Sequence, residues 1–208
     1  MALAAVAGFV DAYGFIRYGT YLSFMSGNTT QAGYGIGRGD FAAVPLFAAA
    51  IVAFLCGSFA GAFYGHPMGR LSRRSILAGI AGAMALVIGL TVAGLSAALP
   101  SVGLIGFAMG AMNTALPGVG AQSVNLTFVT GTLRRLGTHL ALAARHAPLI
   151  DSQGAWDTHR RRALLLAGLW AGFLFGAALG GAATAPAGAY ALLAPIVTLL
   201  IVAACDRA

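Results

Sequence analysis

The side chain best suited to chemistry in this sequence is Asp11, an acid within an otherwise apolar segment. At 1.5 Å per helical residue it lies about 15 Å into the first predicted helix, close to the centre of a bilayer. Ionisable groups at that depth are costly and usually mark a proton, ion or substrate pathway. We therefore interpret Asp11 as a proton carrier; the alternative is a hydrogen-bonded acid that only locks helices together. Its counterpart in the second half of the chain, Asn113, has a similar shape but cannot titrate.

Two polar clusters, which we call the first and second polar knots, are the other candidates for chemistry. SFMSGNTTQAG at 23–33 and TFVTGTLRRLG at 127–137 each surround a glycine with small polar side chains. Each lies in a segment too long for one straight crossing, so we predict helix breaks at Gly27 and Gly131. Neighbouring Ser and Thr can satisfy the backbone groups that such a break frees.

The knots predict a polar pathway, because the ends of broken transmembrane helices often point at a substrate. The alternative is that small polar residues only help helices to pack. The predicted pathway for a small molecule or ion consists of Asp11, Ser26, Gly27, Asn28, Thr29, Asn113, Asn125, Thr130, Gly131 and Thr132.

The elements that must position these residues are membrane helices. Of the 208 residues 59% are hydrophobic and 8% are charged, whereas a soluble domain has about 25% charged residues. No charged residue occurs at 75–133 or at 163–205, and each stretch can hold two spans of roughly 20 residues. We predict an all-α, multi-pass protein of the bacterial cytoplasmic (inner) membrane, embedded in the lipid bilayer.

The arginine positions indicate how many times the chain crosses the membrane. If 2–37 and 101–133 each make one net crossing, there are six crossings, and only Arg17 and Arg38 lie outside. Eight full crossings would put more arginines outside, so the positive-inside rule favours six, with both termini in the cytoplasm. In this arrangement the first and fourth crossings are long, and both are predicted to be broken.

The chain also resembles itself within a single transmembrane domain, 1–208. AFLCGSFAG at 53–61 aligns with GFLFGAALG at 172–180, so the two repeats are about 1–95 and 101–205. With three crossings in each, the halves must have opposite orientations. The sequence therefore predicts a 3+3 inverted repeat, an arrangement common in transporters.

Glycines recur every four residues in both repeats, which places them along one face of a helix. Such strips allow another backbone to approach closely. We expect them to form the interface of a parallel homodimer, or else to pack helices within one subunit. The residues are Gly57, Gly61, Gly65, Gly172, Gly176 and Gly180.

The remaining chemistry-bearing residues indicate neither an enzyme nor a bound cofactor. The four histidines lack the spacing of metal ligands, and the two cysteines do not suggest a disulfide framework or a metal site. The net charge of +7 is interpreted as a record of membrane orientation and not as a nucleic-acid surface.

GFVDAYGF, YLSFMSGNTTQAG and SVNLTFVTGTLRRLG together resemble motifs of the YoaK-like family of bacterial membrane proteins, whose function is unknown. The resemblance covers nearly the whole chain and implies six spans. GHPMGRLSRRSIL at 65–77 is similar to the loop between the second and third helices of major facilitator transporters. That second resemblance implies half a facilitator, working as a dimer.

These observations favour a small secondary transporter or permease, linked to protons through Asp11 and working as a homodimer. A passive channel for a small solute or ion is the alternative that keeps the polar pathway. A membrane scaffold without transport is the alternative in which hydroxyls and glycines serve packing alone.

Overall fold

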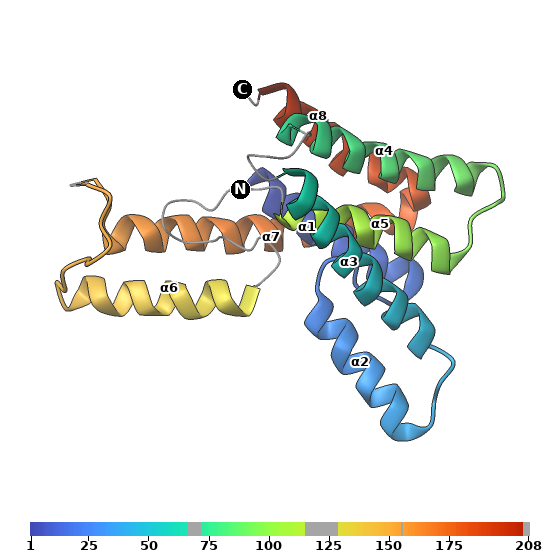
Figure 1. Cartoon of the computed structure of the whole chain (residues 1–208), viewed down its shortest axis with the longest axis horizontal. Coiled ribbons are helices and arrows are strands. Elements are labelled where there is room, and N and C mark those ends of the chain that lie inside the picture. Colours follow the sequence, from blue (N-terminus) through green and yellow to red (C-terminus); the bar gives the residue numbers. More distant parts are fainter. Residues whose placement is uncertain (66–71, 115–128, 155, 206–208) are drawn as a thin grey trace.

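All regular secondary structure is helical in the part of the chain that the computed structural model describes, residues 1–65, 72–114, 129–154 and 156–205. Most helices are rich in Ala and Leu, which are strong helix formers. The predicted all-α class is confirmed (Figure 1). The elements are α1 (Ala2–Tyr18), α2 (Met25–Arg38), α3 (Val44–Gly65), α4 (Arg73–Val92), α5 (Ala98–Thr114), α6 (Val129–Ala144), α7 (His159–Ala187), the short 3₁₀ helix η1 (Gly188–Leu192) and α8 (Leu193–Cys205).

Three helical segments among the described residues are long and apolar enough to cross a membrane: Val44–Gly65, Arg73–Val92 and His159–Cys205. The third covers 47 residues and includes η1, at the start of which Gly188 has a φ of 55°. α5 is a shorter apolar helix. These lengths agree with the membrane protein predicted from composition.

Two helix pairs, α3 with α5 and α1 with α7, make the most extensive contacts in the fold. A Cβ atom on Gly57 would overlap the backbone carbonyl of Phe107, and one on Gly176 would overlap that of Ala5. The backbones therefore approach as closely as glycine permits, which is how small residues stabilise helix pairs in membranes.

The glycine strips thus lie inside the chain. Gly61 and Gly180 contact the same partner helices, α5 and α1, and Gly172 lies against Met1. Gly65 is exposed at the end of α3. Of the two arrangements that the sequence left open, packing within one subunit is the observed one. These faces are therefore occupied and are not free to form the dimer interface that we expected.

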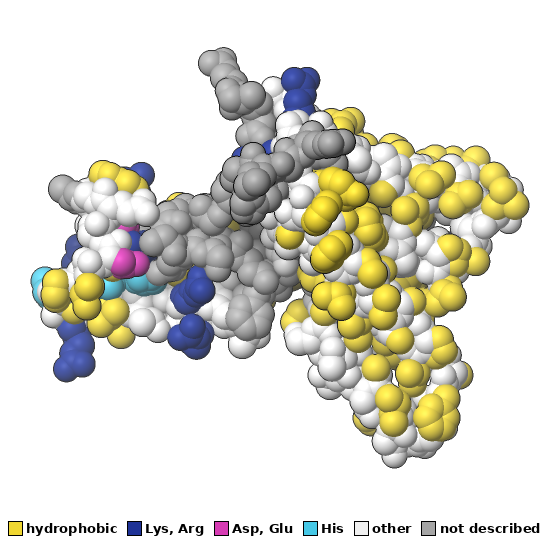
Figure 2. Space-filling view, in the orientation of Figure 1, with side chains coloured by type: hydrophobic (Ala, Val, Ile, Leu, Met, Phe, Trp, Pro, Cys, Tyr) yellow, Lys and Arg dark blue, Asp and Glu magenta, His cyan; other side chains and the backbone are white. Residues whose placement is uncertain are grey.

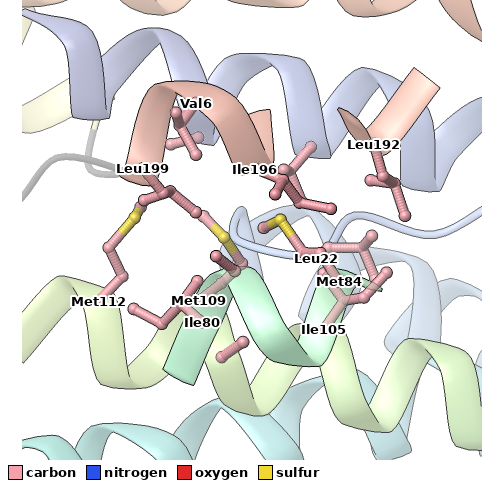
Figure 3. Close-up of a cluster of buried hydrophobic side chains, with 14 of the residues drawn as sticks. Val6, Leu22, Ile80, Met84, Ile105, Met109, Met112, Leu192, Ile196 and Leu199 are labelled. Atoms are coloured by element: carbon pink, nitrogen blue, oxygen red, sulfur yellow. The ribbon is translucent and has the colours of Figure 1, made fainter. Parts of the chain in front are cut away.

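The apolar core lies where α1, α4, α5 and α8 meet. Figure 3 shows side chains of α4, α5 and α8 pointing toward one another, with Leu22 from the connection after α1 beside them. Met84, Met109 and Leu199 are fully buried in this cluster. Since lipid tails are as apolar as these side chains, close packing is what holds such helices together. The core fixes the position of α1 and of the acid that it carries.

α2 and α6, which carry the two polar knots, lie away from this core on separate arms (Figure 1). α2 packs on α3, and α6 packs on α7. There is no contact between α2 and α6 among the described residues. The described residues of the two knots therefore do not meet, and the structure does not assemble the predicted polar pathway from both of them.

The sequence predicted that the first long segment is broken at Gly27. In the structure the break lies earlier, at 19–24. α1 ends at Tyr18, and the next residue, Gly19, has a φ of 70°. Glycine is favoured in this left-handed position after a helix because it has no Cβ. Gly27 lies within the first turn of α2, and Gly131 lies within the first turn of α6. Gly27 is helical because the chain has already turned before it. The segment that precedes α6, and with it any turn before Gly131, lies outside the described residues.

Candidate functional site

The candidate site is centred on Asp11, whose exposure is only 4%. Its Oδ1 accepts hydrogen bonds from the backbone N–H groups of Leu22 (2.9 Å), Ser23 (2.7 Å) and Phe24 (3.3 Å). Its Oδ2 accepts a fourth from the hydroxyl of Ser23 at 2.7 Å. Hydrogen bonds to a carboxylate are about twice as strong as those between neutral groups. One side chain therefore holds three consecutive residues of the connection between α1 and α2.

Asn28 holds the same connection from the side of α2. It is fully buried, and its Oδ1 accepts hydrogen bonds from the Thr20 hydroxyl (2.9 Å) and the Tyr21 N–H (3.0 Å). Its Nδ2 donates to the carbonyl of Tyr21 at 2.6 Å. Asp11 and Asn28 together pair the N–H groups of residues 21–24 and the carbonyl of Tyr21, and a membrane interior requires such pairing of any non-helical segment.

The connection folds back along α1 and does not continue its direction. The buried side chain of Leu22 lies against Gly14, where a Cβ would come within 2.5 Å of the leucine Cγ. Asp11, which binds residues 22–24, lies about 11 Å before the end of α1 at 1.5 Å per residue. The chain has therefore returned by a similar distance at residues 22–24, just before α2 begins.

A surface pocket of about 480 Å³ opens beside this fold-back. It is lined by residues of the connection and of one face of α2, namely Tyr21, Phe24, Ser26, Gly27, Thr30, Gln31 and Tyr34. Three aromatic rings and neutral polar groups make up this lining, with no charged side chain among them. Asp11 does not line the pocket, but it binds the backbone N–H of Phe24, which does. The acid thus supports one wall of the pocket from behind.

The residues of the first knot divide between these two roles. Ser26 and Gly27 line the pocket, as predicted for a polar pathway. Asn28 faces the connection and is shut off from the pocket surface. Thr29 is exposed, and its hydroxyl donates to the carbonyl of Met25 at 2.8 Å within its own helix.

The structure does not bring the second knot to the same place. On α6, Thr130 is exposed, Gly131 is buried and Thr132 is half-buried. α6 packs on α7 and has no contact with α1 or α2 among the described residues. Asn113, the counterpart of the buried acid, is half-buried near the end of α5. Asn125 lies outside the described residues.

Two residues that complete the site were absent from the predicted set. Thr20 binds Asn28, and Ser23 binds Asp11 through both its N–H and its hydroxyl. The signal that could have found them is Gly19, since a glycine after an apolar helical run is typical of a helix end. A helix end at this position puts the following N–H groups within reach of the preceding turns.

We expect Asn28→Ala to destabilise the protein by about 2–4 kcal/mol, because it leaves buried donors and acceptors of Thr20 and Tyr21 without partners. The measurement is reversible unfolding in mixed micelles, by SDS titration. Thr29→Ala is the matched control, one position along the same helix but exposed, and it should change the unfolding free energy by no more than about 0.5 kcal/mol. Equal losses in both variants would contradict the assigned role of Asn28.

A separate charged cluster lies on the hairpin formed by α6 and α7. Figure 2 shows acidic and histidine side chains at this end of the molecule, whereas many hydrophobic side chains cover the visible face of the opposite end. Arg162 forms ion pairs with Asp151 (2.9 Å) and Asp157 (2.7 Å) in the connection before α7. The hydrogen bond from Arg162 lowers the pKa of Asp157 to about 2. The cluster anchors the start of α7 and is distinct from the pocket on α2.

The fold and the buried acid define a class of protein. The described residues form only helices, three apolar segments among them are long enough to cross a membrane, and the chain folds around a hydrogen-bonded acid; such a protein is an integral membrane protein. The chain belongs to the family described as "Protein of unknown function (DUF1275)", whose model matches residues 1–205. The family membership that the motifs indicated is confirmed.

The chain is also similar to one curated relative, the UPF0700 transmembrane protein RA0705 of Rhizobium meliloti (strain 1021). The two are 30% identical over 210 residues, which cover 98% of this chain and 82% of the relative. No solved structure matches the chain.

Proposed function

We propose that this protein is a small secondary transporter in which the pocket on α2 binds the solute and Asp11 links binding to protons. The observation that carries the proposal is that one buried acid holds the backbone of a pocket wall. A carboxylate placed in this way connects its own protonation to the shape of a binding surface.

The coupling step follows from the hydrogen bonds. Ionised Asp11 accepts four of them, from Leu22, Ser23 and Phe24. A proton on the carboxyl removes its charge and converts one oxygen into a donor, so the acid can no longer accept from all of these groups with full strength. The connection is then released, Phe24 moves, and the pocket changes shape.

The lining of the pocket favours a small, uncharged solute with polar groups and an apolar or aromatic part. Ser26, Thr30 and Gln31 offer neutral donors and acceptors. The rings of Tyr21 and Phe24 meet edge to face with centroids 5.3 Å apart and offer an apolar corner. Binding sites for small molecules commonly combine a few polar groups with such aromatic walls.

We also propose that the six crossings form the 3+3 inverted repeat, with both termini in the cytoplasm of a bacterial inner-membrane protein. Contacts between the two halves support this assignment, because a glycine of each half lies against the same aligned phenylalanine of the other half. Gly8 lies against Phe173 of α7, and the aligned Gly110 lies against Phe54 of α3. A duplicated chain with opposed halves produces such reciprocal pairs.

A parallel homodimer is part of the proposal, but its interface is moved from the glycine strips to α2. Gly33 and Gly37 are exposed on this helix, with open space where a Cβ would lie. Polar surface is costly against lipid tails, so this face requires cover from protein or water. A second copy supplies that cover.

The dimer is tested by disulfide crosslinking of Gly33→Cys in membranes, after Cys56 and Cys205 have been changed to Ser. We expect a crosslinked dimer from this variant. Gly82→Cys on α4 also points into open space and serves as the control that should remain monomeric. A monomer from Gly33→Cys would reject α2 as the interface.

Transport is tested with purified protein in liposomes that contain a pH-sensitive dye. A thermal-shift screen against small metabolites and drugs first supplies a solute, and the solute is then added with and without a pH gradient. We expect uptake that follows the proton gradient in the wild type and is lost in Asp11→Asn. Gln31→Ala should weaken binding roughly tenfold, because it removes a polar contact worth about 1.4 kcal/mol.

The saturated hydrogen bonding of Asp11 also favours a second candidate, a membrane scaffold in which the acid only locks the fold-back. If the protein is a scaffold, the Asp11→Asn variant is expected to be less stable and to show no other change. No solute is then expected to shift the unfolding temperature of the protein. A passive channel differs again, because solute flux would occur at equal rates with and without the pH gradient.

A further inference from the structure

Two histidines are buried against each other in the hairpin of α6 and α7, far along the chain from the pocket on α2. His139 lies on α6 and His159 is the first residue of α7, with exposures of 6% and 7%. Their Nδ1 atoms are 2.8 Å apart, and the ring centroids are separated by 5.1 Å. The distance between the nitrogens is that of a hydrogen bond.

The number of protons on the pair decides whether this contact can exist. With both rings neutral, one Nδ1–H donates to the lone pair of the other Nδ1. With one ring protonated, one N–H still faces the lone pair of the other Nδ1, so the bond can still form. With both rings protonated, two N–H groups and two positive charges face each other across 2.8 Å, so the bond is lost and the rings repel.

The charged groups around the pair are bound to one another. The charged groups that act on His139 from the packed elements are Arg162 of α7 and the two acids of the connection, Asp151 and Asp157. Both acids are paired with Arg162, and these ion pairs lower the pKa of each carboxyl below its usual range. The ion pairs therefore stay intact as the pH falls from 7.5 to 5.

Burial lowers the pKa of His139, and the proximity of His159 and Arg162 lowers it further. A histidine whose pKa is lower in the paired state than in the released state binds fewer protons when paired. Pairing is therefore favoured above the ordinary histidine pKa of about 6.5 and weakens as the pH falls below it.

Among the described elements α6 packs only on α7. In the part of the chain that the structure describes, α7 is thus the helix that holds α6, and the histidine pair is a buried polar contact in that surface. We propose that His139 and His159 form a pH-sensitive latch, which fastens α6 to α7 at neutral pH and releases it when acid places a proton on both rings.

The latch is tested on the full-length protein in lipid nanodiscs by electron spin resonance distance measurements. Cys56 and Cys205 are changed to Ser, and spin labels are attached to cysteines at Leu140 of α6 and Leu164 of α7, both exposed. We expect one narrow distance distribution at pH 7.5 and a broader, longer one at pH 5, reversible on return to pH 7.5.

The variant His139→Gln with His159→Gln should lose this pH dependence, because two amides keep a polar contact but do not titrate. His146→Gln is the matched control, since His146 lies just after α6 but is exposed, and this variant should keep the transition. If the double variant fails to fold, His139→Gln alone should also lose the transition, because only one imidazole is left to carry charge.

An unchanged distance between pH 7.5 and pH 5 in the wild type would overturn the latch. Persistence of the transition in the glutamine variants would overturn it too. Neither result depends on transport, so the outcome is separate from that of the proposed function.

Discussion

Asp11→Leu should destabilise the protein by about 4 kcal/mol or more, the largest effect that we expect from any single side chain. The change removes the acceptor of three backbone N–H groups and one hydroxyl, all within a buried site. Each buried donor left without a partner costs about 1–3 kcal/mol. Unfolding in mixed micelles, followed by circular dichroism, measures the loss.

Asp11→Asn separates the charge of this residue from its hydrogen bonds. The amide oxygen can still accept from Leu22, Ser23 and Phe24, so the loss of stability should be only about 1–2 kcal/mol. A leucine variant as stable as the asparagine variant would show that the acid does not hold the connection. These stabilities also decide which variant is used in the transport assay. Asp11→Asn is chosen, because Asp11→Leu is not expected to fold well enough.

Gly176→Ala should be the most damaging change of a single methyl group, with a loss of about 1–3 kcal/mol. The added Cβ would overlap the backbone carbonyl of Ala5, so α7 and α1 must separate. Gly57→Ala should act in the same way on α3 and α5, because its Cβ would overlap the carbonyl of Phe107. Unfolding of the purified protein in mixed micelles measures both losses.

Gly181→Ala is the matched control on the same helix as Gly176, because open space surrounds the position of its Cβ. Alanine forms helices more readily than glycine by about 1 kcal/mol, so this variant should be as stable as the wild type or slightly more so. If Gly176→Ala instead folded normally and lost only a crosslinked dimer, the strips would belong between subunits after all.

The connection at 19–24 shows where interpretation of the sequence reached its limit. Excess length and clustered small polar residues in the first segment predicted a break near Gly27, and a break does occur a few residues earlier. Its position was missed because the polar knot was taken as the break itself. In the structure the knot begins a new helix, and its Asn28 side chain reaches back to Tyr21.

The depth and isolation of Asp11 marked it as an important residue, and its burial agrees with that interpretation. What the acid binds was not predicted, because three of its four hydrogen-bond donors are backbone N–H groups. Every residue other than proline carries such a group, so its pairing leaves no trace in the sequence. The same reason hid the pairing of Asn28.

What the sequence determined by itself is the membrane class, the helical fold, the family and the presence of closely packed glycine faces. These follow from composition and period, which act locally along the chain. Only the tertiary structure decided which helix each glycine face meets, where the chain folds back, and that His139 lies against His159. Such contacts join residues far apart in the sequence, and many apolar helices offer equivalent faces. The choice among them is made by close packing in three dimensions, which no local pattern records.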